Sequence, residues 1–191
     1  MQDLIQVDRL QVNTISPLDG GGTLGTPGAG ITITTTGDGR SFETVLDFVA
    51  LTVGTVAAAA KGIGVKVFTL PAGAQVISSI YHSIAFDNAD GSCDADDPVA
   101  GIGSVVASGA VAVLNGTATF MDYVTEHTAT NCDGVTPLVA LNAPTAGLTS
   151  GIGLNTAALV KDMYLSCAET WTGTTTITAT GRITIKWTLM S

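Results

Sequence analysis

The C-terminal segment of the chain limits the possible folds more than any other part of the sequence. Residues 183–190 read ITIKWTLM, in which apolar and polar residues alternate. A period of two is typical of a strand with one buried face. The preceding segment, TTTITATGR, predicts a partner strand, so we expect a hairpin that turns at Gly181–Arg182. The predicted core residues of this hairpin are Ile183, Ile185, Trp187 and Leu189.

The rest of the chain also favours strands over helices. It has 23 glycines and many Thr and Val residues, and β-branched side chains suit a pleated, half-buried surface. Asn115–Gly116 lies between two β-rich runs, which predicts a hairpin. Segment 43–60 is ambiguous between a strand and one helical turn, and the three GIG triplets are expected at strand-entry turns. The expected fold is all-β, a jelly-roll-like β-sandwich. Strands are predicted at 65–70, 75–86, 104–114, 117–123 and 159–166.

Residues 1–40 differ from the predicted β-sandwich domain, residues 41–191. The stretch SPLDGGGTLGTPGAG is rich in glycine and has little to bury, which predicts an extended N-terminal arm. Such an arm can lock onto a neighbouring subunit, with ITITTT adding a strand to that subunit's sheet. A disordered tail is the alternative. The candidate assembly residues are Leu4, Ile5, Val7, Leu10, Val12, Ile31 and Ile33.

Charge is scarce and mostly negative. Charged residues make up 12% of the chain and the net charge is −9, so no basic face is available for nucleic acid or anionic lipid. The two longest uncharged stretches contain too many Gly, Asn, Ser and Thr residues for a membrane helix. The N-terminus lacks the pattern of a signal peptide, so we expect a soluble protein made in the cytoplasm. A surface of Thr, Ser, Gly and Ala favours a homo-oligomer.

One loop, FDNADGSCDADD, gathers five carboxylates. An EF-hand register with Gly91 at position six places Phe86 at position one, where an oxygen ligand is needed. A looser calcium site remains an alternative to a solvated loop between two strands, and the solvated loop is favoured. The weak calcium candidates are Asp87, Asp90, Asp94, Asp96 and Asp97.

No catalytic motif is present. Asp122, Glu126 and His127 in MDYVTEH, together with His82, could form an acid–base set, but no known motif relates them. We therefore expect no enzymatic activity and no cofactor. A zinc site from both histidines with Cys93 and Cys132 has no supporting spacing.

Cysteine and tryptophan positions give weaker hints. Three free thiols are the expectation in a reducing compartment, with Cys167 buried and a contact between Cys93 and Cys132 conceivable. Trp187 is expected in the core and Trp171, near Gly173, at the surface.

Three segments resemble structural proteins of tailed bacteriophages. They are VFTLPAGAQVISSIYHSIAF, GIGSVVASGAVAVLNGTATFMDYVTEHTATNCDG and TWTGTTTITATGRITIKW, which together span roughly residues 45–190. The resemblance implies a β-sandwich virion protein, most specifically a head decoration (cement) protein, and it implies no catalytic residue.

The function expected from this resemblance is stabilisation of the phage head. The chain would bridge subunits of the major capsid protein, as a homotrimer on the capsid surface, after synthesis in the host cytoplasm. The alternatives are another virion position, in the neck or tail, or a receptor- or sugar-binding β-sandwich module.

Overall fold

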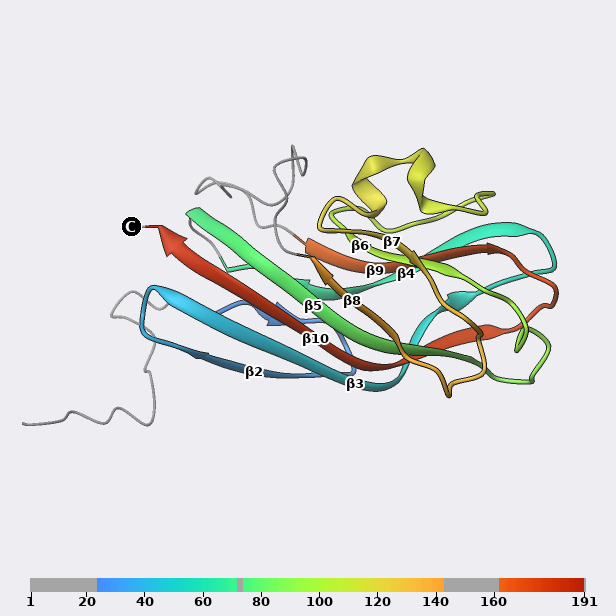
Figure 1. Cartoon of the computed structure of the whole chain (residues 1–191), viewed down its shortest axis with the longest axis horizontal. Helices are drawn as coiled ribbons and strands as arrows, with labels where there is room; N and C mark the ends of the chain where they lie inside the picture. The colour runs from blue at the N-terminus through green and yellow to red at the C-terminus, as the bar shows by residue number, and fades with distance from the viewer. Residues whose placement is uncertain (1–23, 72–73, 143–161, 191) are drawn as a thin grey trace, which may run out of the picture.

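The computed structural model describes residues 24–71, 74–142 and 162–190, and these form two five-stranded antiparallel sheets (Figure 1). In sheet A the order is β1 (Thr26–Pro27), β4 (Ala60–Thr69), β9 (Asp162–Thr170), β6 (Val99–Gly103) and β7 (Val124–Thr128). In sheet B it is β2 (Ile31–Gly37), β3 (Ser41–Thr55), β10 (Thr176–Met190), β5 (Ala74–Asn88) and β8 (Leu138–Asn142). Two short 3-10 turns, η1 (Leu114–Gly116) and η2 (Ala118–Phe120), lie between β6 and β7.

The eight strands from β3 to β10 form four nested pairs. β6 pairs with β7, β5 with β8, β4 with β9 and β3 with β10, all antiparallel. β10 also pairs with β5, and β9 with β6, and these contacts join the four pairs into the two sheets. A long hairpin rolled up in this way is a jelly roll, as the sequence predicts. β1 and β2 each add one edge strand, to β4 and β3 respectively.

The core between the sheets confirms the alternation at the C-terminus. Ile183 and Ile185 are completely buried and Trp187 is 1% exposed. The side chain of Leu189 lies outside the described residues. The inward faces of β3, β5 and β9 supply further core residues, among them Leu46, Ile80, Ile84 and Leu165. Within the described residues, no helix is long and apolar enough to cross a membrane.

The predicted C-terminal hairpin is wrong, because TTTITATGR and ITIKWTLM form one continuous strand, β10. The pairing with β3 shifts register between Ala179 and Gly181, so this region is a bulge. A Cβ atom on Gly181 would clash with the main-chain oxygen of Ser83 on β5. Glycine is therefore needed here for close approach between strands, and the chain continues without turning.

Two further predicted strands are wrong. Segments 104–114 and 117–123 contain bends and the two 3-10 turns, and Asn115–Gly116 belongs to η1 and not to a hairpin. The other predicted strands overlap β4, β5 and β9, and segment 43–60 is mostly β3.

The GIG triplets are also placed differently from the prediction. Residues 62–64 lie inside β4 and residues 101–103 inside β6, while residues 151–153 lie outside the described residues. Their isoleucines, Ile63 and Ile102, point into the core.

The N-terminal region contributes to the sandwich of its own chain from residue 24 onward. β2 pairs along its length with β3, with Ile31 opposite Phe48 and Ile33 opposite Leu46. Ile31 is 9% exposed and Ile33 packs against the core. The predicted boundary at residue 40 thus falls in the connection between two paired strands. ITITTT, expected to add a strand to a neighbouring subunit, adds it to its own sheet.

Candidate interaction surface

The outer face of sheet B is open among the described residues and carries mostly hydroxyl groups. The period of two that buries one face of each strand points Thr32, Thr34 and Thr36 of β2 outward, and all three are exposed. Thr184 lies next to Tyr81, which is 38% exposed, and Val139 of β8 is 54% exposed. We call this surface, formed by the outward residues of β2, β3, β10, β5 and β8, the open face.

The charges on the open face are paired with each other. Arg182 of β10 binds Asp47 of β3 through two hydrogen bonds, from Nε at 2.6 Å and from one terminal nitrogen at 3.0 Å. Hydrogen bonding to Asp47 raises the pKa of Arg182. Lys186 lies 3.5 Å from Glu43 in the same pair of strands. Since the two residues of each pair are directly opposite in the register, the face is close to neutral without a partner.

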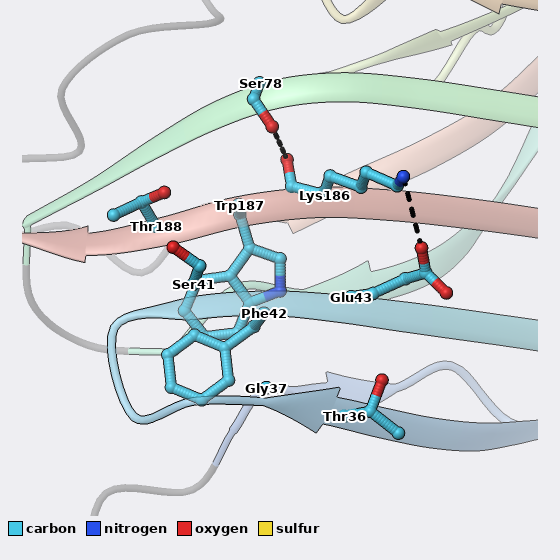
Figure 2. A pocket seen from close by; sticks show the side chains of 9 residues that line it. All are labelled: Thr36, Gly37, Ser41, Phe42, Glu43, Ser78, Lys186, Trp187 and Thr188. Atoms are coloured by element: carbon cyan, nitrogen blue, oxygen red, sulfur yellow. Dashed lines mark hydrogen bonds and ion pairs between the residues drawn. The ribbon is translucent and has the colours of Figure 1, made fainter.

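Three shallow hollows lie on or beside the open face. Figure 2 shows one of about 420 Å³, between the ends of β2, β3 and β10, which is lined by the stacked rings of Phe42 and Trp187 together with Ser41 and Thr188. A second, of about 500 Å³, lies over the β10 bulge and includes Val49, which is 81% exposed. The third, of about 270 Å³, lies beside Tyr81 and Thr184. Each offers hydroxyl and apolar contacts, which suits a protein surface or a small polar ligand.

The outer face of sheet A is covered by its own chain. Residues 104–123, which we call the covering segment, pack on the glycines of the two described GIG triplets. A Cβ on Gly103 would clash with the main chain of Phe120, and one on Gly62 would lie 2.7 Å from the side chain of Val111. Outward glycines therefore let the covering segment lie directly on the sheet.

The residues considered for acid–base chemistry hold the covering segment in place. Asp122 accepts hydrogen bonds from the main-chain nitrogen of Ser104 at 2.6 Å and from its hydroxyl at 2.7 Å. Glu126 accepts one from the main-chain nitrogen of Leu114 at 2.8 Å. Both carboxylates therefore accept hydrogen bonds from main-chain nitrogens of the covering segment. They do not form an acid–base group with the two histidines.

The two histidines of that set do meet, at the edge where β7 and β8 lie close. Their ring centroids are 6.3 Å apart in an edge-to-face arrangement. His82 is 2% exposed, and neither ring nitrogen has a hydrogen-bond partner among the described residues. Burial, and then the nearby His127, lower the pKa of His82 to about 4; the main chain of Leu138 opposes this weakly, without hydrogen-bond geometry. His82 is thus a neutral residue at physiological pH.

The acidic loop joins two strands, as predicted, but it makes more contacts than a merely solvated loop, and the strand that follows it is β6 and not the predicted segment 104–114. Asp96 is 6% exposed and accepts hydrogen bonds from the main-chain nitrogen of Thr172 at 3.0 Å and from its hydroxyl at 2.9 Å. Asp94 accepts from the side-chain amide of Asn88 at 2.6 Å, and Asp90 from the main-chain nitrogen of Ser92 at 3.0 Å. Asp87 and Asp97 are exposed. Within the described ranges, no three His, Cys, Asp or Glu side chains are grouped as a metal site would require.

Cys93, Cys132 and Cys167 are free, as expected, and all three are buried, which the sequence predicts only for Cys167. Trp171 is 2% exposed, so the prediction of a surface tryptophan is wrong; its Nε1 donates a hydrogen bond to the main-chain oxygen of Lys61 at 2.8 Å. The predicted assembly residues Leu4, Ile5, Val7, Leu10 and Val12 lie outside the described residues.

The sequence does not indicate the open face, although ITITTT contains its alternation. Comparison of the chain with protein-family models, with curated proteins and with solved structures found no match.

Proposed function

We propose that this chain is a structural protein of a tailed-bacteriophage particle, a decoration (cement) protein that stabilises the head and has no catalytic activity. It would be made in the host cytoplasm and then bind the capsid surface, bridging subunits of the major capsid protein. Two lines of support meet here: the sequence resemblance over residues 45–190, and the asymmetry between the covered face of sheet A and the open face of sheet B.

The open face is the observation on which this proposal depends most. Hydroxyl side chains on it can exchange water for protein partners, and the two ion pairs can stay intact when the face is covered. Docking then requires no isolated charge to be buried, which would cost several kcal/mol per ion. A face of this kind suits permanent assembly on a shell better than capture of a charged ligand.

We further propose that the bound form is a homotrimer and that residues 1–23 contact an adjacent subunit. The described chain begins beside β1, at the edge of sheet A, with Leu24 packed against the core. From there the 23 preceding residues can reach a neighbour, and their five apolar anchor candidates supply the contact area. A position in the neck or tail would use the same open face, so the location on the particle is the finer part of the proposal.

A sugar-binding module is less well supported. Stacking on a sugar ring needs an exposed aromatic side chain, and Trp171 and Trp187 are both buried. Tyr81 is exposed on the open face but has no aromatic neighbour described there.

Two measurements test the proposal. Imaging of an intact particle that carries this chain should place it on the capsid surface. A position elsewhere in the particle would overturn the decoration role and leave only the proposal of a phage structural protein. Binding of purified protein to undecorated heads should fall at least tenfold for the double variant Thr34→Lys, Thr184→Lys, which adds two unpaired charges to the open face. The double variant Thr117→Lys, Thr119→Lys, on the exposed part of the covering segment, adds the same charge as a matched control and should bind as wild type does. Equal binding by all three proteins would overturn the role of the open face.

A further inference from the structure

Two loops that are far apart in sequence meet at the end of β5. One is the acidic loop, and the other, residues 129–137, joins β7 to β8. Asp87 forms a β-bridge with Asp133, and the main-chain nitrogen of Gly134 donates to the oxygen of Phe86 at 2.7 Å. Each loop contains one cysteine, Cys93 in the acidic loop and Cys132 in the other.

One side-chain amide joins the main chains of these two cysteines. Asn88 donates from Nδ2 to the main-chain oxygen of Cys132 at 2.8 Å and accepts at Oδ1 from the main-chain nitrogen of Cys93 at 3.3 Å. The main-chain nitrogen of Cys132 also donates to the oxygen of Asp94 at 3.1 Å. The main chains of Cys93 and Cys132 are therefore bridged by the single side-chain amide of Asn88. None of these hydrogen bonds involves a sulfur atom.

Both thiols point into the same hydrophobic cluster and are fully buried. Burial raises the pKa of the Cys132 thiol to about 12, and the next largest contribution comes from Cys93, ahead of the nearby aspartates. The Cys167 thiol lies in the same cluster, and its pKa is raised by burial and by Cys132, so the choice of partner rests on the main-chain geometry.

We propose that Cys93 and Cys132 form a disulfide when the protein passes from a reducing to an oxidising environment, joining the acidic loop to the loop between β7 and β8. The third thiol is a poorer partner because Cys167 lies in the middle of β9, paired with Ile63 of β4 on one side and Ala100 of β6 on the other. Disulfides need a particular separation and orientation of both residues. Two loop residues can adjust to it, whereas a central strand residue cannot without breaking its pairings.

The oxidant is a small disulfide such as oxidised glutathione. When local opening of the acidic loop exposes the buried Cys93 thiol, its thiolate attacks one sulfur of that disulfide and releases one glutathione thiolate. The Cys132 thiolate then attacks the Cys93 sulfur of the mixed disulfide and releases the second. In total, two protein thiols lose two electrons and two protons, and one glutathione disulfide becomes two thiols. Because the thiolate is the attacking form, the raised pKa values of both thiols predict faster closure in mildly alkaline buffer.

Peptide mapping tests the pairing directly. The full-length folded protein is incubated with oxidised glutathione, its remaining thiols are alkylated, and it is digested with trypsin. Cleavage after Lys66, Lys161 and Arg182 leaves Cys93 and Cys132 in one peptide and Cys167 in the next. The proposed disulfide lowers the mass of the first peptide by two hydrogens and leaves Cys167 alkylated. A cross-link between the two peptides, or three alkylated cysteines after long incubation, would overturn the proposal.

A stability measurement distinguishes a native disulfide from one trapped in unfolded chains. Closing a loop of about 40 residues in the folded protein should raise Tm by about 5–10 °C, reversibly on reduction. Cys167→Ser should keep this rise and Cys93→Ser should lose it. A disulfide that forms only in denaturant, or one that forms in the folded protein and lowers Tm, would contradict the inference.

Discussion

Trp187 and Thr44 are joined by a hydrogen bond inside the sandwich, from the indole Nε1 to the hydroxyl oxygen at 3.0 Å. The same hydroxyl lies 3.1 Å from that of Thr35, so one polar chain crosses β10, β3 and β2. Phe42 stacks on the indole with ring centroids 4.4 Å apart. A buried indole can therefore keep its only polar atom satisfied while the rest of its surface packs in the core.

Removing the hydroxyl of Thr44 should destabilise the fold. Thr44→Val keeps the shape of the side chain but leaves the buried Trp187 nitrogen without an acceptor, which costs about 1–3 kcal/mol. The free energy of unfolding, from urea titration at neutral pH, should fall by this amount. Thr44→Ser is the control, because it keeps the oxygen and loses only a methyl group. Equal stability of Thr44→Val and wild type would mean that the hydrogen bond contributes nothing.

Stability should fall on mild acidification because of His82. Its pKa is about 4 in the folded protein, against an ordinary value of 6.5 for an exposed histidine, so the unfolded chain binds the proton more tightly. The stabilisation is present above pH 6.5, declines as the pH falls toward 4, and amounts to at most about 3 kcal/mol. The difference between the unfolding midpoints at pH 7 and pH 4.5 should therefore be smaller in His82→Leu than in wild type. His127→Gln, which keeps the buried ring of His82, should retain most of the decline. An unchanged pH dependence in His82→Leu would contradict this account.

The acidic loop should contribute to stability through Asp96 and not through calcium. Asp96→Ala removes the acceptor for both Thr172 donors and should cost about 2 kcal/mol, whereas Asp97→Ala, on an exposed side chain, should change stability by less than about 0.5 kcal/mol. Three of the other carboxylates already accept hydrogen bonds within the loop. Thermal melting in millimolar CaCl₂ and in EDTA should therefore give the same Tm. A higher Tm in CaCl₂ than in EDTA would instead support the looser calcium site.

Two N-terminal deletions should separate the arm from the sandwich. Removing residues 1–23 should leave the sandwich folded but weaken the oligomer or its retention on particles. Removing residues 1–37 also takes away β1 and β2. This exposes the edges of β4 and β3 and removes the core contacts of Ile31 and Ile33, so Tm should drop by several degrees. Light scattering and melting curves measure the two effects. Full assembly and particle binding after the shorter deletion would reduce residues 1–23 to a tail.

The sequence predicts this fold best where the pattern is local. Alternation alone places Ile183, Ile185 and Trp187 in the core, because a strand with one buried face requires it. The errors arise where a distant strand decides the outcome. Gly181 looks like a turn residue in isolation, but the approach of β5 makes it a bulge within one long strand.

The same limit applies to the surface. Val105, Val106 and Val111 give segment 104–114 the composition of a strand, yet that segment lies across sheet A and not within it. Trp171 looks exposed beside Gly173, but its indole is buried and donates a hydrogen bond to the main-chain oxygen of Lys61. The open face depends on which residues stand opposite each other, as Arg182 and Asp47 do across 135 positions. Local sequence patterns contain no such information.

The nested pairing of β3 to β10 also sets an order for folding. β6 and β7 close the shortest loop, and each outer pair closes a longer one, ending with β3 and β10. Loop closure costs entropy before contacts repay it, so the inner pairs should form first and assembly should proceed outward. The outermost pair brings together strands near opposite ends of the described chain, which places this protein among slow folders, on a scale of about milliseconds to seconds. Until β10 pairs with β3 and β5, those strands expose unpaired edges. Where many chains are made close together, pairing between chains would therefore compete with folding.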